Sequence, residues 1–465
     1  MPLALPNPNA LTKSQTMLLA DFEMGAVNKG QAMHDLATTL WPYNRSITGP
    51  GLRQTLDILS KRHDGFRTHH FKTGTHVFDW EIPREWTIWD AYIEHESGQR
   101  FAEFAKNNLS VLGYAAPLDI VLDHADLDPY LYTQPDQPDR IPYVTSYYKE
   151  RSGFCMRENE KAALPTGKFR LFIDSEFSDG EVVIGECVIP GESDREILFS
   201  TYICHPSMAN NELSGPVLAD QILQDLAERK ASTGLRYTYR VLFLVETIGS
   251  IAYLSRFAGH LKAQVDAGFV LSCVGDERAY SHVESRFGTS LADRALNAAL
   301  KGLPNTKRYS FLQRGSDERQ FCAPGIDLPV CGFCKSKYGE YQEYHTDADD
   351  LTLVTPKGLS DAHRVISDVI GALEHGLYPK TNVLCEPQMG KRGLYPTISQ
   401  KGSYDAVRLR MDTLAYADGQ IDVFDMCERI GVNLGTLNDE LEILTVNGLI
   451  STENAKHELE TGNVG

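Results

Sequence analysis

Hydrophobic positions in the central part of the chain, from about residue 170 to 375, follow two alternating patterns. Short apolar runs alternate with segments in which apolar residues recur at helical spacing. The runs that predict strands are Phe169–Ile173, Glu181–Ile189, Glu196–Ile203, Tyr239–Val245 and Val265–Val274. Strands that alternate with helices are typical of an open, mostly parallel α/β sheet flanked by helices. We predict this fold class for the central segment.

The pattern differs in the part of the chain that precedes this segment. Residues 30–65 carry apolar positions at helical spacing on both sides of the breaker Thr48–Gly51, which predicts two helices. From about 76 to 164, aromatic and β-branched residues alternate with turn signals. We therefore predict an inserted β-rich domain at 76–164, between the parts 1–75 and 165–385 of the main α/β domain.

The C-terminal segment, 390–465, is predicted to be mostly helical. The expected helices are Tyr404–Tyr416, Val423–Ile430 and Leu434–Val446, with Asn433 as a helix cap and Asn447–Gly448 opening a hairpin. This arrangement resembles a winged helix, a fold that often binds DNA. Residues 403–465, however, contain four Lys or Arg against twelve Asp or Glu, so contact with phosphate would be repulsive. We predict a domain used for packing or dimerisation, in a chain that could form a homo-oligomer.

Composition restricts the class of protein further. The chain is 42% hydrophobic and 23% charged, which are ordinary values for a globular protein. Its length of 465 residues suggests two or three domains. No apolar run approaches the roughly 20 residues of a membrane helix, and the first 25 residues do not resemble a signal peptide. Nine scattered cysteines predict reduced thiols, and a net charge of −18 argues against nucleic acid or anionic lipid as partner. We predict a cytoplasmic protein without a membrane partner.

Candidate site residues follow the predicted strands. His205, Glu246 and Asp276 each come just after an apolar run, and His345 lies in an acidic loop whose carboxylates could orient its imidazole. Taken alone, each has an ordinary explanation as a turn residue, a helix cap or part of a solvated loop. Taken together they predict a shared site, because strand ends in such a sheet converge on one crevice. Imidazole and carboxylate groups in a crevice predict zinc-dependent hydrolysis, with a further carboxylate accepting a proton from water.

Several motifs in this order resemble the zinc aminopeptidase family typified by bacterial leucine aminopeptidases. They are His205, the Ala209–Gly215 loop, Glu246–Gly249, Asp276, Ser316–Asp317 and Tyr344–Thr346. More narrowly, Cys204–Ser207, Glu246–Ser250 and Lys337–Tyr341 resemble an aminopeptidase-like subfamily of unassigned function, with an inserted β-rich domain and a C-terminal winged helix. The subfamily resemblance covers nearly the whole chain, whereas that to the characterised aminopeptidases is confined to the α/β segment.

The resemblance implies specific roles. His205 and Asp276 would match the ligands of one zinc ion, His345 would match a ligand of a second, and Glu246 would match the general base. Two positions depart from the family pattern, because Asn211 stands in place of a metal-bridging aspartate and Thr247 in place of a ligand glutamate. Neither side chain is a strong zinc ligand. We therefore favour one zinc ion over two, with Glu212 replacing the missing carboxylate.

Further residues are predicted to complete the site. If Glu246 binds the metal itself, Glu343 or Glu318 becomes the candidate base. Asn211, Asp317, Glu318 and Arg319 are predicted to contact substrate, although the last three could equally form an internal salt-bridged turn. The pair Cys331 and Cys334 has metal-ligand spacing but stands alone, so we predict buried thiols.

These observations predict a zinc-dependent hydrolase of aminopeptidase type that cleaves a peptide or amide bond near a free amine. Two alternatives stay open. One is an amidase acting on an intermediate of polysaccharide or natural-product biosynthesis. The other is a non-catalytic binding protein with the same fold. The presence of Asn211 and Thr247 in place of two acids keeps this alternative open.

Overall fold

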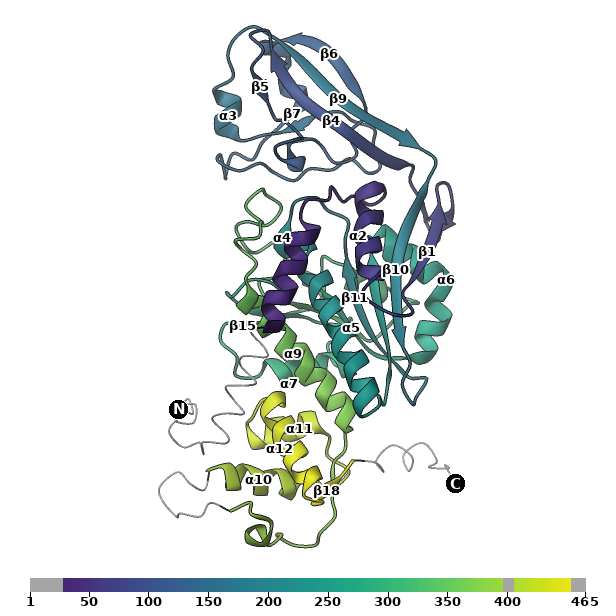
Figure 1. The fold of residues 1–465 in the computed structure, drawn as a ribbon, viewed down its shortest axis with the longest axis vertical. Helices are drawn as coiled ribbons and strands as arrows, with labels where there is room; N and C mark the ends of the chain where they lie inside the picture. Colours follow the sequence, from purple (N-terminus) through teal and green to yellow (C-terminus); the bar gives the residue numbers. More distant parts are fainter. Residues whose placement is uncertain (1–27, 396–404, 453–465) are drawn as a thin grey trace. The chain divides into compact units, whose positions relative to one another are not determined.

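The computed structural model of the protein describes residues 28–395 and 405–452 (Figure 1). The chain divides into two compact units. One comprises Gly30–Ala292 and Lys307–Ala362, and the described part of the other comprises residues 28–29, Asp293–Thr306, 363–395 and 405–452. Among the described residues, no helix combines the length and apolar character that crossing a membrane requires.

An eight-stranded sheet forms the centre of the larger unit. Its four middle strands are parallel, and two antiparallel strands extend it on one side. In order across the sheet the strands are β1 (Arg67–Lys72), β10 (Glu181–Ile189), β12 (Thr238–Leu244), β11 (Glu196–Tyr202), β13 (Val265–Leu271), β16 (Val330–Cys334), β14 (Tyr280–Val283) and β15 (Thr306–Tyr309). Every residue of β11 and β12 is buried, as expected of strands covered on both faces. The predicted fold class is confirmed.

Helices connect the parallel strands. α5 (Ser214–Ser232) leads from β11 to β12, and α6 (Ile248–Gln264) leads from β12 to β13. Apolar residues at helical spacing on α5 are all buried, which explains how the helix packs on the sheet: Leu213 at its N-cap, Val217, Leu218, Ile222 and Leu226. The other helices are one over residues 28–40, α2 (Pro50–Ser60), α4 (Ala209–Glu212), α7 (Leu291–Leu300), α8 (Glu318–Phe321) and α9 (Pro356–His375).

A second, antiparallel sheet forms the inserted domain. Its strand order is β5 (Arg100–Phe101), β4 (Glu85–His95), β9 (Lys168–Ser178) and β6 (Leu118–Asp123). Shorter elements accompany it: β2 (His76–Val77), β3 (Trp80–Glu81), β7 (Leu131–Tyr132), β8 (Phe154–Cys155) and α3 (Glu158–Ala162). The strand expected at Phe169–Ile173 forms, but it is part of β9 and pairs with β4 and β6. Its assignment to the α/β sheet was wrong, because its alternating apolar residues cover the core of the second sheet.

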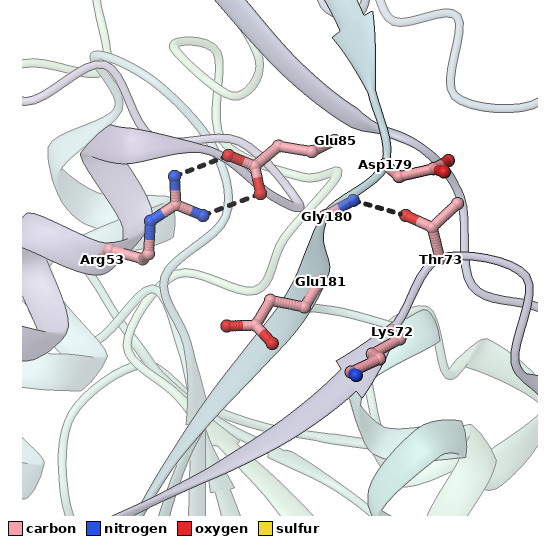
Figure 2. A pocket seen from close by; sticks show the side chains of 7 residues that line it. All are labelled: Arg53, Lys72, Thr73, Glu85, Asp179, Gly180 and Glu181. Carbon is pink, nitrogen blue, oxygen red and sulfur yellow. Dashed lines mark hydrogen bonds and ion pairs between the residues drawn. The ribbon is translucent and has the colours of Figure 1, made fainter.

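The chain passes between the two sheets at two places, from β1 to β4 across residues 73–84 and from β9 to β10 across residues 179–180. The β4–β9 ladder ends at Glu85 opposite Ser178, and the β1–β10 ladder begins at Lys72 opposite Glu181. A pocket of about 500 Å³ lies at this junction. Figure 2 shows the side chains that line it. Its lining residues are Arg53, Lys72, Thr73, Glu85, Asp179, Gly180 and Glu181. A bidentate pair between Arg53 and Glu85, at 2.8 and 2.5 Å, ties the junction to α2.

The described C-terminal segment contains three helices and a small two-stranded sheet. The helices are α10 (Asp405–Tyr416), α11 (Val423–Ile430) and α12 (Leu434–Val446), in agreement with the predicted spans. Asn433 caps α12, because its side chain accepts a hydrogen bond from the Thr436 N–H. After the turn at Gly448, β18 (Ile450–Ser451) pairs with β17 (Lys380–Thr381). Residues 453–465, where the predicted hairpin would continue, lie outside the described residues.

Candidate metal centre

The predicted site residues follow neighbouring parallel strands. His205 comes after β11, Glu246 after β12 and Asp276 after β13, and these strands are adjacent in the sheet. His345 lies in the loop that follows β16, which neighbours β13. The sheet therefore directs all four loops to its carboxyl edge, where α/β folds form binding sites.

His205 and Glu212 form the buried centre of the site. The Oε1 atom of Glu212 contacts Nδ1 of His205. The Oε2 atom of Glu212 accepts hydrogen bonds from the backbone N–H groups of Cys204, at 2.6 Å, and His205, at 2.8 Å. The thiol of Cys204 lies 3.2 Å from the same Nδ1 atom. Cys204, His205 and Glu212 are all buried and offer one sulfur, one nitrogen and one oxygen atom within reach of a single metal ion.

Glu246 and His345 complete the group on the other side of His205. The Oε2 atom of Glu246 lies 3.8 Å from Nε2 of His205. The ring centres of His205 and His345 are 5.8 Å apart, so residues 140 positions apart in the chain meet as the sequence predicts. The side chain of Glu246 is 22% exposed, whereas those of His205 and Glu212 are 7% and 0% exposed.

The electrostatics of the group follow from its burial. Burial raises the pKa of Glu246 to about 8, although His205 opposes the shift. Burial by itself would lower the pKa of His205, but the charge and contact of Glu212 raise it overall. Burial and the charge of His205 lower the pKa of His345 to about 3, so this imidazole is neutral at physiological pH. A neutral imidazole beside carboxylates is the form that binds a metal ion.

Asp276 uses both carboxylate oxygens to hold neighbouring loops. Oδ1 accepts hydrogen bonds from the Ser336 hydroxyl at 2.8 Å and the Arg278 N–H at 2.9 Å. Oδ2 accepts hydrogen bonds from the Ser336 N–H at 2.9 Å and the Asn210 side chain at 3.2 Å. The described contacts of Asp276 thus lead to Asn210 and Ser336 rather than to His205. Its role as a ligand stays a prediction.

Asn211 is buried beside the same loop. Its side chain donates to the Tyr202 hydroxyl at 3.2 Å, and its N–H donates to Asp349 at 3.1 Å. Its Oδ1 atom has no hydrogen-bond partner within the described part of the chain. Two acids of the loop that carries His345 bind other groups: Asp349 accepts a hydrogen bond from Tyr341, and Asp347 pairs with Arg157.

The predicted substrate residues of the 317–319 turn make mainly internal contacts. Asp317 accepts hydrogen bonds from the Thr247 N–H and the Ser250 hydroxyl, both at 2.8 Å. Glu318 accepts a hydrogen bond from the Tyr338 hydroxyl at 2.6 Å, and Arg319 donates to the Thr247 hydroxyl. Asp317 and Glu318 are fully buried, whereas Arg319 is partly exposed. Contact with substrate stays a prediction for these residues.

Four non-glycine residues with left-handed backbone conformations lie in the loops around the site. They are Ser207 (φ 38°), Thr247 (φ 64°), Cys273 (φ 52°) and His345 (φ 56°). Each such residue costs on the order of 1–3 kcal/mol and persists only where the surroundings impose it. Strained residues of this kind are typical of functional sites.

Sequence reasoning missed two residues of this group. Cys204 belongs to a quoted motif, and its position next to His205 could have indicated a metal ligand. Tyr143 belongs to the inserted domain, yet its ring lies 4.9 Å from that of His205 and 5.1 Å from that of His345. No local pattern marks Tyr143, because only the folding of the inserted domain brings it to the site. As predicted, Cys331 and Cys334 are buried thiols, and no disulfide joins any of the nine cysteines, all of which are described.

The donor set is compatible with zinc. Imidazole nitrogen, thiol sulfur and carboxylate oxygen are the groups that bind zinc in proteins. Glu212 Oε1 makes no hydrogen bond among the described residues besides its contact with His205, and Asn211 Oδ1 is also without a partner. A nearby cation would stabilise these two buried oxygen atoms, which lie in the same site as Glu246 with its raised pKa.

Comparison with known proteins supports the assignment of the fold. A relative from Clostridium acetobutylicum, provisionally named a polysaccharide biosynthesis protein with aminopeptidase-like domain, is 40% identical over 406 residues, which span 87% of this chain and 92% of the relative. A crystal structure of a provisionally named peptidase from the same organism has 36% identity and a TM-score of 0.83, and the match covers 94% of this chain and 99% of that one. A zinc aminopeptidase from Bacillus subtilis has 13% identity and a TM-score of 0.50, over 73% and 94% of the two chains, which is a likeness of fold alone.

Two family models match the chain. Residues 377–452 match the winged helix-turn-helix family, which confirms the predicted C-terminal fold. Residues 34–376 match the family described as "Domain of unknown function (DUF4910)". The resemblance to zinc aminopeptidases is thereby confirmed at the level of an aminopeptidase-like fold. The protein belongs to the DUF4910 family, and a winged helix-turn-helix domain follows its aminopeptidase-like domain.

Proposed function

We propose that the protein is a metal-dependent hydrolase of aminopeptidase type, which cleaves a peptide or amide bond near a free amine. The observation that carries the proposal is the meeting of two imidazoles and two carboxylates at the carboxyl edge of the sheet: His205, His345, Glu212 and Glu246. A zinc ion bound there would polarise the substrate carbonyl and lower the pKa of water. We assign its binding to His205 and His345, with Glu212, Asp276 and Cys204 as further candidate ligands.

Glu246 is the candidate proton carrier. Its carboxyl group stands at the end of a buried strand, close to His205 and partly exposed to solvent. A carboxylate in this position could accept a proton from an attacking water molecule and return it to the leaving amine. With burial holding its pKa near 8 in the absence of a cation, Glu246 can hold a proton at neutral pH once it has accepted one.

The charge of the surroundings favours a substrate with an amine. Glu246, Glu212 and Asp317 are acids within one small region, and their mutual repulsion contributes to the raised pKa of Glu246. An ammonium group would relieve this repulsion, whereas a second carboxylate would increase it. A substrate amine beside the scissile bond is therefore the better match.

One observation favours a second candidate, an amidase that acts on a polysaccharide intermediate. The Clostridium acetobutylicum relative is named for polysaccharide biosynthesis as well as for its aminopeptidase-like domain. The third candidate, a binding protein without catalysis, draws support from Asn211 and Thr247, which stand where the resembling enzymes carry acids.

A substrate screen on protein with measured metal content separates the three candidates. We expect bound zinc and hydrolysis of aminoacyl-anilides. Turnover of acylated sugars alone would favour the amidase, and bound zinc without turnover of either class would favour the binding protein. Protein that binds no metal and turns over neither class would overturn the proposal.

A further inference from the structure

The inserted domain reaches the candidate metal centre through one segment. Residues 141–143 lie antiparallel to residues 345–347, with a β-bridge between Pro142 and Thr346. Two backbone hydrogen bonds flank this bridge, from Tyr143 N to His345 O at 2.8 Å and from Asp347 N to Ile141 O at 3.0 Å. The segment is therefore fixed directly to the loop that carries His345.

Side chains reinforce this attachment. Asp347 accepts a hydrogen bond from the Ile141 N–H at 2.9 Å and forms an ion pair with Arg157 at 2.6 Å. Gln137 donates from its side chain to the Gln342 carbonyl at 3.0 Å. The Asp347 side chain is only 7% exposed, whereas that of Arg157 is 43% exposed, so the pair lies at the surface end of the attachment.

Tyr143 extends from this segment over both histidines. Its ring is inclined at 62° to the ring of His205 and at 84° to that of His345, so it meets both in edge-type contacts. Its hydroxyl is 2.6 Å from the hydroxyl of Tyr147, whose ring in turn contacts Tyr114 at 5.2 Å. The Tyr143 side chain is thus held at its backbone and at its tip.

Exposure distinguishes Tyr143 from a tyrosine that serves packing alone. Tyr114, in the interior of the same domain, is only 2% exposed. Tyr143 and Tyr147 both stay partly exposed, as residues in the wall of a solvent-accessible site do.

We propose that the inserted domain forms a fixed roof over the candidate metal centre and that Tyr143 is a specificity-determining residue for the substrate. With its ring centre near 5 Å from both imidazole rings, Tyr143 contacts them directly, so a substrate group bound at these histidines also meets Tyr143. A bulky acyl or aminoacyl group next to these histidines would press on the Tyr143 ring, whereas a small group would not. The role of Tyr143 in substrate specificity rests on the proposed hydrolase function. The covering of the two histidines by the inserted domain does not depend on that function.

The roof is tested on metal-free protein by the reaction of histidines with diethyl pyrocarbonate, located by mass spectrometry. We expect Tyr143→Ala to increase the rate of modification of His205, and Tyr143→Phe to leave that rate close to the wild-type value because the ring remains. Tyr92→Ala serves as a matched control, since Tyr92 packs under Arg100 away from the site. Equal rates at His205 in wild type and Tyr143→Ala would overturn the roof.

The filter is tested on the active enzyme with paired small and bulky acyl substrates. Opening a pocket changes discrimination by about tenfold or more, so we expect Tyr143→Ala to raise the ratio of kcat/KM for bulky over small substrates by that factor. Tyr143→Phe should keep the wild-type ratio. An unchanged ratio in Tyr143→Ala would overturn the filter. Absence of turnover in wild type would count against the hydrolase function and hence the filter, while the modification experiment would still decide the roof.

Discussion

Glu212 stands directly behind His205 and contacts it twice, through the ring Nδ1 atom and, at 2.8 Å, through the backbone N–H. A carboxylate in this position fixes the orientation and tautomer of a histidine and leaves Nε2 to face a metal ion. The sequence predicted Glu212 as a ligand, and the geometry gives it this positioning role as a second hypothesis.

The positioning role predicts a moderate effect for Glu212→Gln. Loss of a carboxylate that orients a metal-bound histidine weakens metal affinity by about 10–100-fold. Competition with a chromophoric chelator measures this affinity. Glu228→Gln, at an exposed position on α5, should bind zinc as the wild type does. Affinity that is unchanged in Glu212→Gln would contradict both roles, and complete loss of binding would favour Glu212 as a ligand.

Glu246→Gln should separate catalysis from metal binding. If Glu246 carries the proton, the variant keeps its metal while kcat falls by at least about 100-fold, because an amide cannot accept the proton. Metal content and steady-state kinetics on the same preparation provide the measurement. Loss of the ion together with activity would instead identify Glu246 as a ligand.

The order of the site loops could be predicted from the sequence, because apolar runs locate β11, β12 and β13 and strand ends in such a sheet converge. The meeting of His205 with His345 follows from this rule. The membership of β9 could not be predicted, because alternating apolar residues indicate a half-buried strand but not which sheet it joins. The place of Tyr143 depends on tertiary contacts alone.

The carboxyl group of Asp368 should make the free energy of unfolding of the C-terminal unit depend on pH. Burial raises its pKa to about 7. In the unfolded chain the pKa of this carboxyl group is near its ordinary value of 3.8. Between pH 3.8 and pH 7 the folded protein therefore binds more protons than the unfolded chain. The free energy of unfolding therefore falls as pH rises from about 4 to about 7, by roughly 3 kcal/mol from this group.

Asp368→Asn should flatten this dependence, because an amide does not titrate. Urea unfolding of wild type and variant at pH 5 and pH 7.5 measures the difference. Asp439→Asn is a useful comparison, since Asp439 contributes to the raised pKa of Asp368 by repulsion. An identical pH dependence in wild type and Asp368→Asn would show that Asp368 does not retain its proton.

The winged helix is predicted not to bind DNA. On α12, Asp439 and Glu442 are exposed, and Glu440 is occupied by an ion pair with Arg410 at 2.9 Å. An acidic helix repels phosphate, and the repulsion is largest in low salt. Fluorescence anisotropy with labelled duplex DNA in low salt should show no saturable binding. Saturable binding that weakens as salt is added would contradict this prediction.

The metal content of protein purified without chelators tests the central claim most directly. We predict one zinc ion per chain in wild type and in His124→Ala, a control at an exposed histidine of the inserted domain. The ion should be absent from His205→Ala and retained less tightly by His345→Ala, because both imidazoles face the same centre. Wild-type protein that binds no divalent metal, or His205→Ala that retains the full complement, would contradict the account.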